Sequence, residues 1–200
     1  EARGIERLQR LTGQLAELAG TSTQLRLAAM RRVASDSAVV AYLSGAESDT
    51  AARRRAVAAL GGLSISSTDT TLVAELRPTS EAIRVGTTPE VAGDEDEPIA
   101  ALIASLKDGQ PAIGALYVRN DSAYYWVGES VTDRGRVLGH VLLRRTVSSS
   151  PRTERTIREL AGTDQVSIYI ASDNAEKWAS LSGRATPAPS LTRDSTEAPN

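Results

Sequence analysis

The chain has no cysteine and no phenylalanine, and it has only one histidine among its 200 residues. Without cysteine, disulfide bonds, thiolate metal sites and a thiol nucleophile are all excluded. A single histidine, His140, leaves little material for general acid-base or triad chemistry. Glycine-rich phosphate loops, nucleophile elbows and zinc-protease motifs are also missing from the sequence. We therefore predict a protein that is not an enzyme, with no catalytic residues, no cofactor and no metal site.

The chain also lacks a strong charge of either sign and lacks long apolar runs. Its net charge of −2 argues against nucleic acid as a partner, because phosphate binding needs a clear excess of Lys and Arg. It has no apolar run of 18 residues and no signal-peptide pattern. Because it begins at Glu1 rather than Met, we interpret it as an excised segment of a longer protein. Both an exported domain between membrane spans and a cytoplasmic fragment fit that interpretation.

Apolar residues recur at helical spacing over residues 5–43, which predicts one long amphipathic helix or two in series. Four leucines in this segment keep the 3-4-3 spacing of a coiled-coil seam: Leu8, Leu11, Leu15 and Leu18. Such a seam would join two copies of the chain, whereas a helix lying on its own domain would show a similar pattern. Residues 20–23 interrupt the seam and could mark a kink or a restart.

Further elements follow in an alternating order. A helix is expected over residues 50–60, capped by Ser48 or Asp49, and a hairpin over 71–76 and 82–85. A short helix over 98–106 follows an acidic run, whose charges suit a helix N-terminus better than a calcium loop. Beyond the central strands we expect a helix over 152–161, a strand over 165–171, a helix or turn over 174–181, and a loosely ordered tail from Arg184.

Residues 113–145 contain three strand-like runs joined by two short turns, which predicts an antiparallel meander. Asn120 and Asp121 both tolerate positive φ and indicate a two-residue hairpin loop. That loop pairs Arg119 with Ser122, Tyr117 with Tyr124, and Ala115 with Trp126, so these six side chains share one face. The opposite face would carry Leu116, Val118, Tyr125 and Val127, an apolar surface suited to the long helix.

The face that carries Tyr117, Arg119, Tyr124 and Trp126 has the aromatic floor and polar groups of a small-molecule site. The same side chains could equally be cross-strand pairs that fill the core. The register of the third strand, over 136–146, stays open: in one register His140 joins this face, and in the other Val141 and Leu143 do. Arg84 and Arg144 could supply positive charge, although a solvated surface is the default for both. The predicted ligand-binding residues are Tyr117, Arg119, Tyr124, Trp126, His140 and Arg84.

The order of elements resembles that of the extracytoplasmic Cache sensor domains of bacterial membrane receptors. The resemblance is carried by the leucines from Leu8 to Leu18, by residues 109–119, 137–145 and 160–170, and by Trp178. It implies an α+β fold, a PAS/Cache-like antiparallel sheet packed on a long N-terminal helix with further short helices. The predicted divisions are 1–62 for the N-terminal helices, 63–162 for the sensor sheet with its helices, and 163–200 for a membrane-proximal strand and a flexible Pro/Ser/Thr-rich tail, which could together be an incomplete second subdomain.

The resemblance also implies a function. It predicts an extracytoplasmic, ligand-binding sensory domain of a receptor such as a histidine kinase, a chemoreceptor or a cyclase, flanked by membrane spans and forming a homodimer. Amino-acid-binding members of the family carry a Tyr, Arg, Trp and Tyr set that this sequence does not show, so an amino-acid ligand is not implied. The alternatives are a non-sensing dimerisation or spacer module and, more weakly, an enzyme of unrecognised type with a cleft of clustered titratable groups.

Overall fold

A computed structural model gives the arrangement of mixed helices and antiparallel sheet, which confirms the α+β class. The structure describes residues 2–45, 49–63, 73–77, 83–86, 96–106, 110–147, 155, 169–172, 176–180 and 182–189. The helix expected over 152–161 lies outside the described residues apart from Arg155. Asp94 and Glu95 of the acidic run before the short helix also lie outside them.

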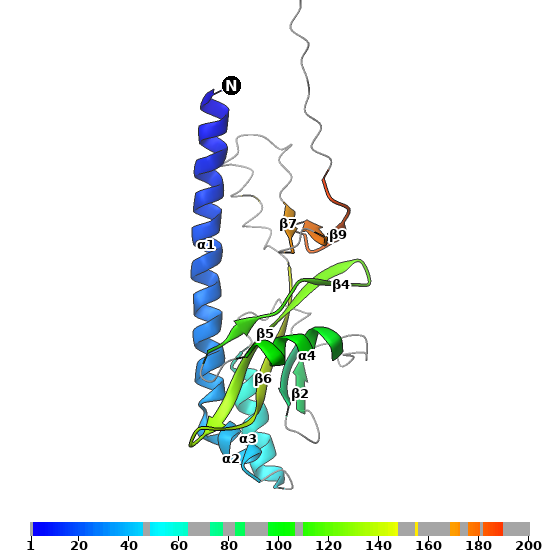
Figure 1. The fold of residues 1–200 in the computed structure, drawn as a ribbon. Coiled ribbons are helices and arrows are strands. Elements are labelled where there is room, and N and C mark those ends of the chain that lie inside the picture. Colours follow the sequence, from blue (N-terminus) through cyan, green and yellow to red (C-terminus); the bar gives the residue numbers. More distant parts are fainter. Residues whose placement is uncertain are drawn as a thin grey trace, which may run out of the picture.

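Two helices in series begin the chain. Helix α1 (Ala2–Ala34) is continuous through residues 20–23, so the helix does not restart there, and the break to α2 (Ser37–Leu43) falls at Ser35 and Asp36. Asp36 caps α2, because its Oδ1 accepts a hydrogen bond from the backbone N–H of Ala38 at 2.8 Å. The C-terminal half of α1 lies along the sheet, and its N-terminal half extends beyond the six-stranded sheet (Figure 1).

Two further helices lie on opposite sides of the sheet. Helix α3 (Thr50–Gly61) begins at the predicted cap Asp49, whose Oδ1 accepts from the backbone N–H of Ala51 at 2.7 Å. Its alanine-rich inner face packs beside α1 and α2. Helix α4 (Asp96–Ser105) covers the other face (Figure 1). Its side chains Ile99 and Leu102 are buried there.

The main sheet has the strand order β2-β1-β6-β5-β3, with β4 also paired to β5, and its pairs are antiparallel. The strands are β1 (Val73–Arg77), β2 (Ile83–Gly86), β3 (Ala112–Ile113), β4 (Tyr117–Arg119), β5 (Ser122–Asp133) and β6 (Arg136–Thr146). The hairpin of β1 with β2 and the meander that ends in β5 and β6 are therefore confirmed.

The first turn of the meander has the predicted form. Asn120 and Asp121 have φ angles of 47° and 59°, as a two-residue type I′ loop requires. Tyr117 pairs with Tyr124 as expected. The expected pairing of Ala115 with Trp126 is wrong, because the chain slips by one residue between β3 and β4. The backbone N–H of Gly114 instead donates to the carbonyl oxygen of Trp126 at 2.8 Å.

The register of β6 is decided by a bulge and not by its turn. If the pairing that starts at the two-residue turn of Arg134 and Gly135 continued along both strands without interruption, Trp126 would lie opposite Leu143. A register shift beyond Val131 adds one residue to β6, so that Trp126 lies opposite Arg144. Every side chain of β6 past the bulge therefore points to the face opposite to the one that the turn alone would give.

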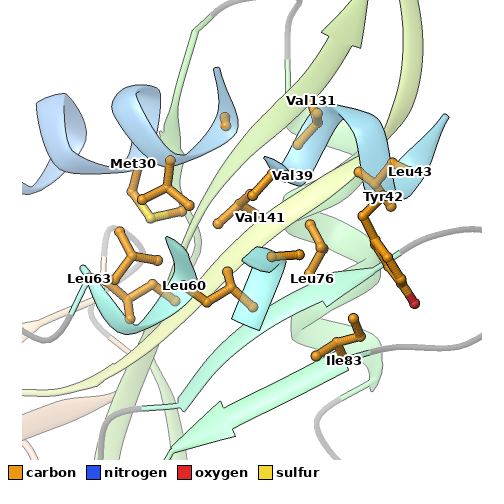
Figure 2. Close-up of a cluster of buried hydrophobic side chains, with 14 of the residues drawn as sticks. Met30, Val39, Tyr42, Leu43, Leu60, Leu63, Leu76, Ile83, Val131 and Val141 are labelled. Atoms are coloured by element: carbon orange, nitrogen blue, oxygen red, sulfur yellow. The ribbon is translucent and has the colours of Figure 1, made fainter. Parts of the chain in front are cut away.

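The larger core lies between the sheet and the first three helices. Met30 of α1, Val39 and Leu43 of α2 and Leu60 of α3 meet strand residues such as Val141 in one buried cluster (Figure 2). The odd-numbered residues of β5 line this side, among them Val127 and Val131. Helix α1 therefore packs on the part of the predicted aliphatic face that carries Tyr125 and Val127. The prediction is wrong for the other two residues, because Val118 is exposed and Leu116 packs against the small cluster around Ala123.

A small second sheet joins the hairpin tip. It contains β7 (Tyr169–Ala171), β8 (Trp178–Ser180) and β9 (Ala185–Thr186), in that order. The backbone N–H of Ala123 donates to the carbonyl oxygen of Gly183 at 2.8 Å, and that of Ala185 donates to Asp121 at 2.8 Å. Trp178 therefore lies in a strand and not in a helix or turn, and the expected loose tail contributes β9 before residues 190–200, which lie outside the description.

In the described residues, no helix combines the length and the apolar character that crossing a membrane requires. Among the same residues, no group of three or more histidine, aspartate or glutamate side chains is placed to hold a metal ion.

Candidate functional site

Three of the predicted site residues come together on the α4 side of the sheet. Tyr117 and Tyr124 face each other across the β4–β5 hairpin, with ring centroids 5.8 Å apart and planes inclined at 28°. Trp126 follows two positions later on β5 and therefore lies on the same face. All three belong to, or pack against, the buried cluster beneath Ile99 and Leu102 of α4.

Arg144 is the fourth member of this group. It lies directly opposite Trp126 on β6, is only 4% exposed, and its guanidinium carbon lies 5.2 Å from the centre of the Tyr124 ring. This is the geometry of a cation–π contact, which is stronger when water is excluded. The default expectation of a solvated Arg144 is wrong, because the bulge turns it inward. Tyr117, Tyr124, Trp126 and Arg144 are called the aromatic cluster below.

The indole of Trp126 carries an unused hydrogen-bond donor. The side chain is 1% exposed, and within the described part of the chain its Nε1 has no hydrogen-bond partner. A buried Trp N–H normally finds an acceptor, and leaving one unpaired costs about 1–3 kcal/mol. An acceptor atom of a bound molecule would remove that cost.

Helix α4 approaches the sheet closely beside this donor. A Cβ atom on Gly128 would lie 3.0 Å from Cδ2 of Leu102 and 3.1 Å from Cδ2 of Leu142. Because Gly128 has no side chain, Leu102 can seat on the strand next to Trp126. α4 therefore forms the cover of the aromatic cluster.

Arg119 and His140 lie on the same face but at different distances from this cluster. Arg119, half-buried and paired with Ser122, extends the row of Tyr117 toward the hairpin tip. His140 lies opposite Ser130, four residues along β5 from Trp126, or about 13 Å away. The structure thus places His140 on the predicted face but does not bring it to the aromatic cluster.

His140 has its own surroundings at the far end of the face. Its Nδ1 lies 3.5 Å from Oγ of Ser130, and Arg77 is its partner on β1. Burial, and then the positive charge of Arg77, lower the pKa of His140 below its usual value of 6.5. The imidazole is therefore held neutral near pH 7, and it offers neutral hydrogen bonding and not a cationic contact for a ligand.

Arg84 does not join the aromatic cluster. Its backbone lies in β2, opposite Glu75 of β1, so three strand spacings separate it from β5, or about 14 Å. The side chain of Arg84 lies outside what the structure describes. The site residue that the sequence did not select is Arg144, because the one-residue bulge in β6 that turns it inward was not predicted.

Comparisons with protein-family models, with curated proteins and with solved structures found no match for this chain.

Proposed function

We propose that this chain is the extracytoplasmic sensory domain of a bacterial membrane receptor, such as a histidine kinase, a chemoreceptor or a cyclase. It binds a small molecule against the aromatic cluster and carries the signal through α1. The observation on which the proposal rests is the buried Trp126 N–H, which has no acceptor among the described residues. Trp126 pairs across the sheet with Arg144, whose guanidinium lies over one of the two stacked tyrosines. A planar ligand with an acceptor atom fits that chemistry.

The strand order supports a PAS/Cache-like sheet. When β3 and β4 are counted as one broken strand, the order β2-β1-β6-β5-β3 becomes 2-1-5-4-3, a five-stranded antiparallel sheet compatible with the one that the resemblance implies. A long helix on one face and a short helix on the other agree with the resemblance to Cache domains. The proposed localisation outside the cytoplasm follows from that resemblance, and protease accessibility of the parent protein in intact cells tests it.

The signalling mechanism uses the alternation of β5. Trp126 points to α4, whereas its neighbours Tyr125 and Val127 point to the helical core, and the hydroxyl of Tyr125 accepts a hydrogen bond from Nη1 of Arg26 on α1 at 3.2 Å. A ligand that shifts Trp126 moves the backbone that holds α1. The ligand therefore biases two arrangements of that helix by binding one of them more tightly.

The test is a thermal-shift scan with a metabolite library on the wild type and on Trp126→Phe. A ligand at about 100 times its Kd adds about 2.7 kcal/mol of stability, or roughly 5–11 °C for a domain of this size. Trp126→Phe keeps a ring but removes the N–H, so the ligand-free protein should fold while the shift is lost. Val118→Ala, at an exposed position on the opposite face of the hairpin, is the matched control and should keep the full shift. If no compound raises the melting temperature, the sensing proposal is wrong.

A second function, a dimerisation module, is favoured by Leu25. It lies seven residues after Leu18, in step with the leucine seam, and its side chain is 66% exposed on α1. We propose that a second copy of the chain covers it, as in a coiled coil. Sedimentation of Leu25→Glu and of Gln24→Glu, an adjacent exposed position, tests this: only Leu25→Glu should lower the dimer fraction. If the wild type stays monomeric at high concentration, the proposed dimer is refuted.

A further inference from the structure

On the face of the sheet that packs against α1, α2 and α3, the described residues include an acidic side chain in an apolar position. Glu129 lies on β5 between Val127 and Val131, opposite Val141 of β6, and all three valines belong to the core beneath α1. Its side chain is 2% exposed. Glu129 therefore occupies a position that the alternation of β5 gives to hydrophobic residues.

The carboxyl group is incompletely satisfied there. It receives a hydrogen bond from the backbone N–H of Ser130, but Oε2 has no hydrogen-bond partner within the described part of the chain. A buried carboxylate needs several donors or a close ion pair to remain charged, and a protonated carboxyl group does not. The surroundings of Glu129 thus favour its neutral form.

Ionisable side chains are present on the elements that pack on this side of the sheet. They are Arg26, Arg31 and Arg32 on α1, Asp36 before α2, Tyr42 on α2, the exposed Asp49, Arg53, Arg54 and Arg55 at and on α3, Tyr125 on β5 and Arg145 on β6. The charge that acts on the Glu129 carboxyl is that of Arg31, whose side chain is exposed. Arg26 is hydrogen-bonded to Tyr125, and the Asp36 carboxylate caps α2.

We propose that protonation of Glu129 controls how tightly α1 is held against the sheet. When neutral, the side chain fits the apolar contact between β5 and α1. When it loses its proton, the charge is left in that contact, and α1 must move to admit water. This acid-sensitive contact is separate from the aromatic cluster, because Glu129 points to the opposite face, and it requires no ligand.

The direction of the pH effect follows from linkage. Desolvation is the largest influence and raises the pKa of Glu129 above its usual 4.5, while Arg31 and the Ser130 hydrogen bond lower it. In the packed state the proton is therefore held more tightly than in the open state, in which the pKa is ordinary. The contact is strongest below pH 4.5 and weakens as the pH rises from there to the raised pKa, by up to about tenfold in the opening constant per pH unit.

The test is amide hydrogen exchange of residues 30–34 in α1, measured from pH 4 to pH 8 on the wild type and on Glu129→Gln. At each pH the ratio of the two rates cancels the intrinsic pH dependence of exchange. Glutamine keeps the shape and has no charge. The wild-type exchange rate divided by the Glu129→Gln rate should therefore be near one at pH 4 and rise by about tenfold per pH unit until it levels off. A ratio that does not change with pH overturns the proposal.

Two further variants separate this mechanism from a general loss of stability. Arg31→Gln removes the charge that lowers the pKa of Glu129, so that pKa should be higher in the variant. The rate ratio to Glu129→Gln should therefore keep rising to a higher pH before it levels off. Glu17→Gln changes an exposed glutamate on the same helix and should follow the wild type at every pH. If Arg31→Gln leaves the levelling-off pH unchanged, or if Glu17→Gln reproduces the effect of Glu129→Gln, the assignment to Glu129 is refuted.

Discussion

Gly139 offers the most direct experimental check of the register of β6. A Cβ atom on Gly139 would lie 2.7 Å from the carbonyl oxygen of Arg77 in β1 and 3.1 Å from Cδ1 of Leu43 in α2. Real Cβ atoms essentially never come within 3.0 Å of a neighbour, and here the nearer atom is backbone, which cannot rotate aside. Gly139→Ala must therefore push β1 away from β6 or displace α2.

Overpacking of this kind costs about 1–3 kcal/mol. For a domain of 200 residues this lowers the melting temperature by about 2–12 °C. Thermal unfolding followed by circular dichroism measures the change. Gly13→Ala is the matched control: Gly13 lies within α1 with open space around its Cβ position, and alanine in a helix interior gains about 0.5–1 kcal/mol over glycine.

The result that would refute this reasoning is a Gly139→Ala variant that melts at or above the wild-type temperature while Gly13→Ala behaves as expected. β1 would then not approach β6 at Gly139, and the one-residue bulge beside it would be misplaced. Without that bulge Arg144 would leave the aromatic cluster and Leu143 would take its place. The same measurement therefore checks the geometry on which the proposed ligand site depends.

Three other predictions concern stability. Leu102→Ala should cost about 2–5 kcal/mol in denaturant unfolding, because it empties the contact between α4 and Gly128; a cost under 1 kcal/mol would mean that α4 does not pack there. Asp49→Ala should cost about 0.5–2 kcal/mol by removing the cap of α3, with Asp49→Asn nearly neutral; equal losses would argue against capping. Because the folded state lowers the pKa of His140, stability should fall as the pH drops below 6.5, and His140→Gln should reduce that slope in pH-dependent unfolding. An unchanged slope would show that His140 is not buried as described.

Local chemistry accounts for much of what could be predicted. Asn120 and Asp121 determine a type I′ loop because few other residues adopt positive φ, and the loop in turn sets the pairing of Tyr117 with Tyr124. Alternation along β5 then assigns Trp126 and Val127 to opposite faces. These features depend on neighbours in the chain, so the sequence alone was sufficient for them.

The position of Trp178 shows where local patterns fail. Residues 174–181 suggested a helix or turn, yet β8 forms because β7 and β9 supply strand partners on both sides. The hydrogen bonds from Ala123 and Ala185 then join this small sheet to the hairpin tip. Such partners are distant in sequence, and their contribution cannot be seen in a window of a few residues.

By itself, the sequence determined the hairpin, its two faces, the place where α3 is capped and the aromatic part of the candidate site. Only the tertiary structure decided that Arg144 joins that site, because one extra residue in β6 reverses the faces, and that Arg84 does not, because strand order sets lateral distance. His140 shares the face but stays apart because it lies opposite Ser130, four residues along β5 from Trp126. It also decided that Glu129 is buried, since α1 covers its face of β5. The physical reason is the same for Arg144 and for Glu129: the solvation of a charged side chain depends on which element packs over it, and that packing is a long-range property of the fold.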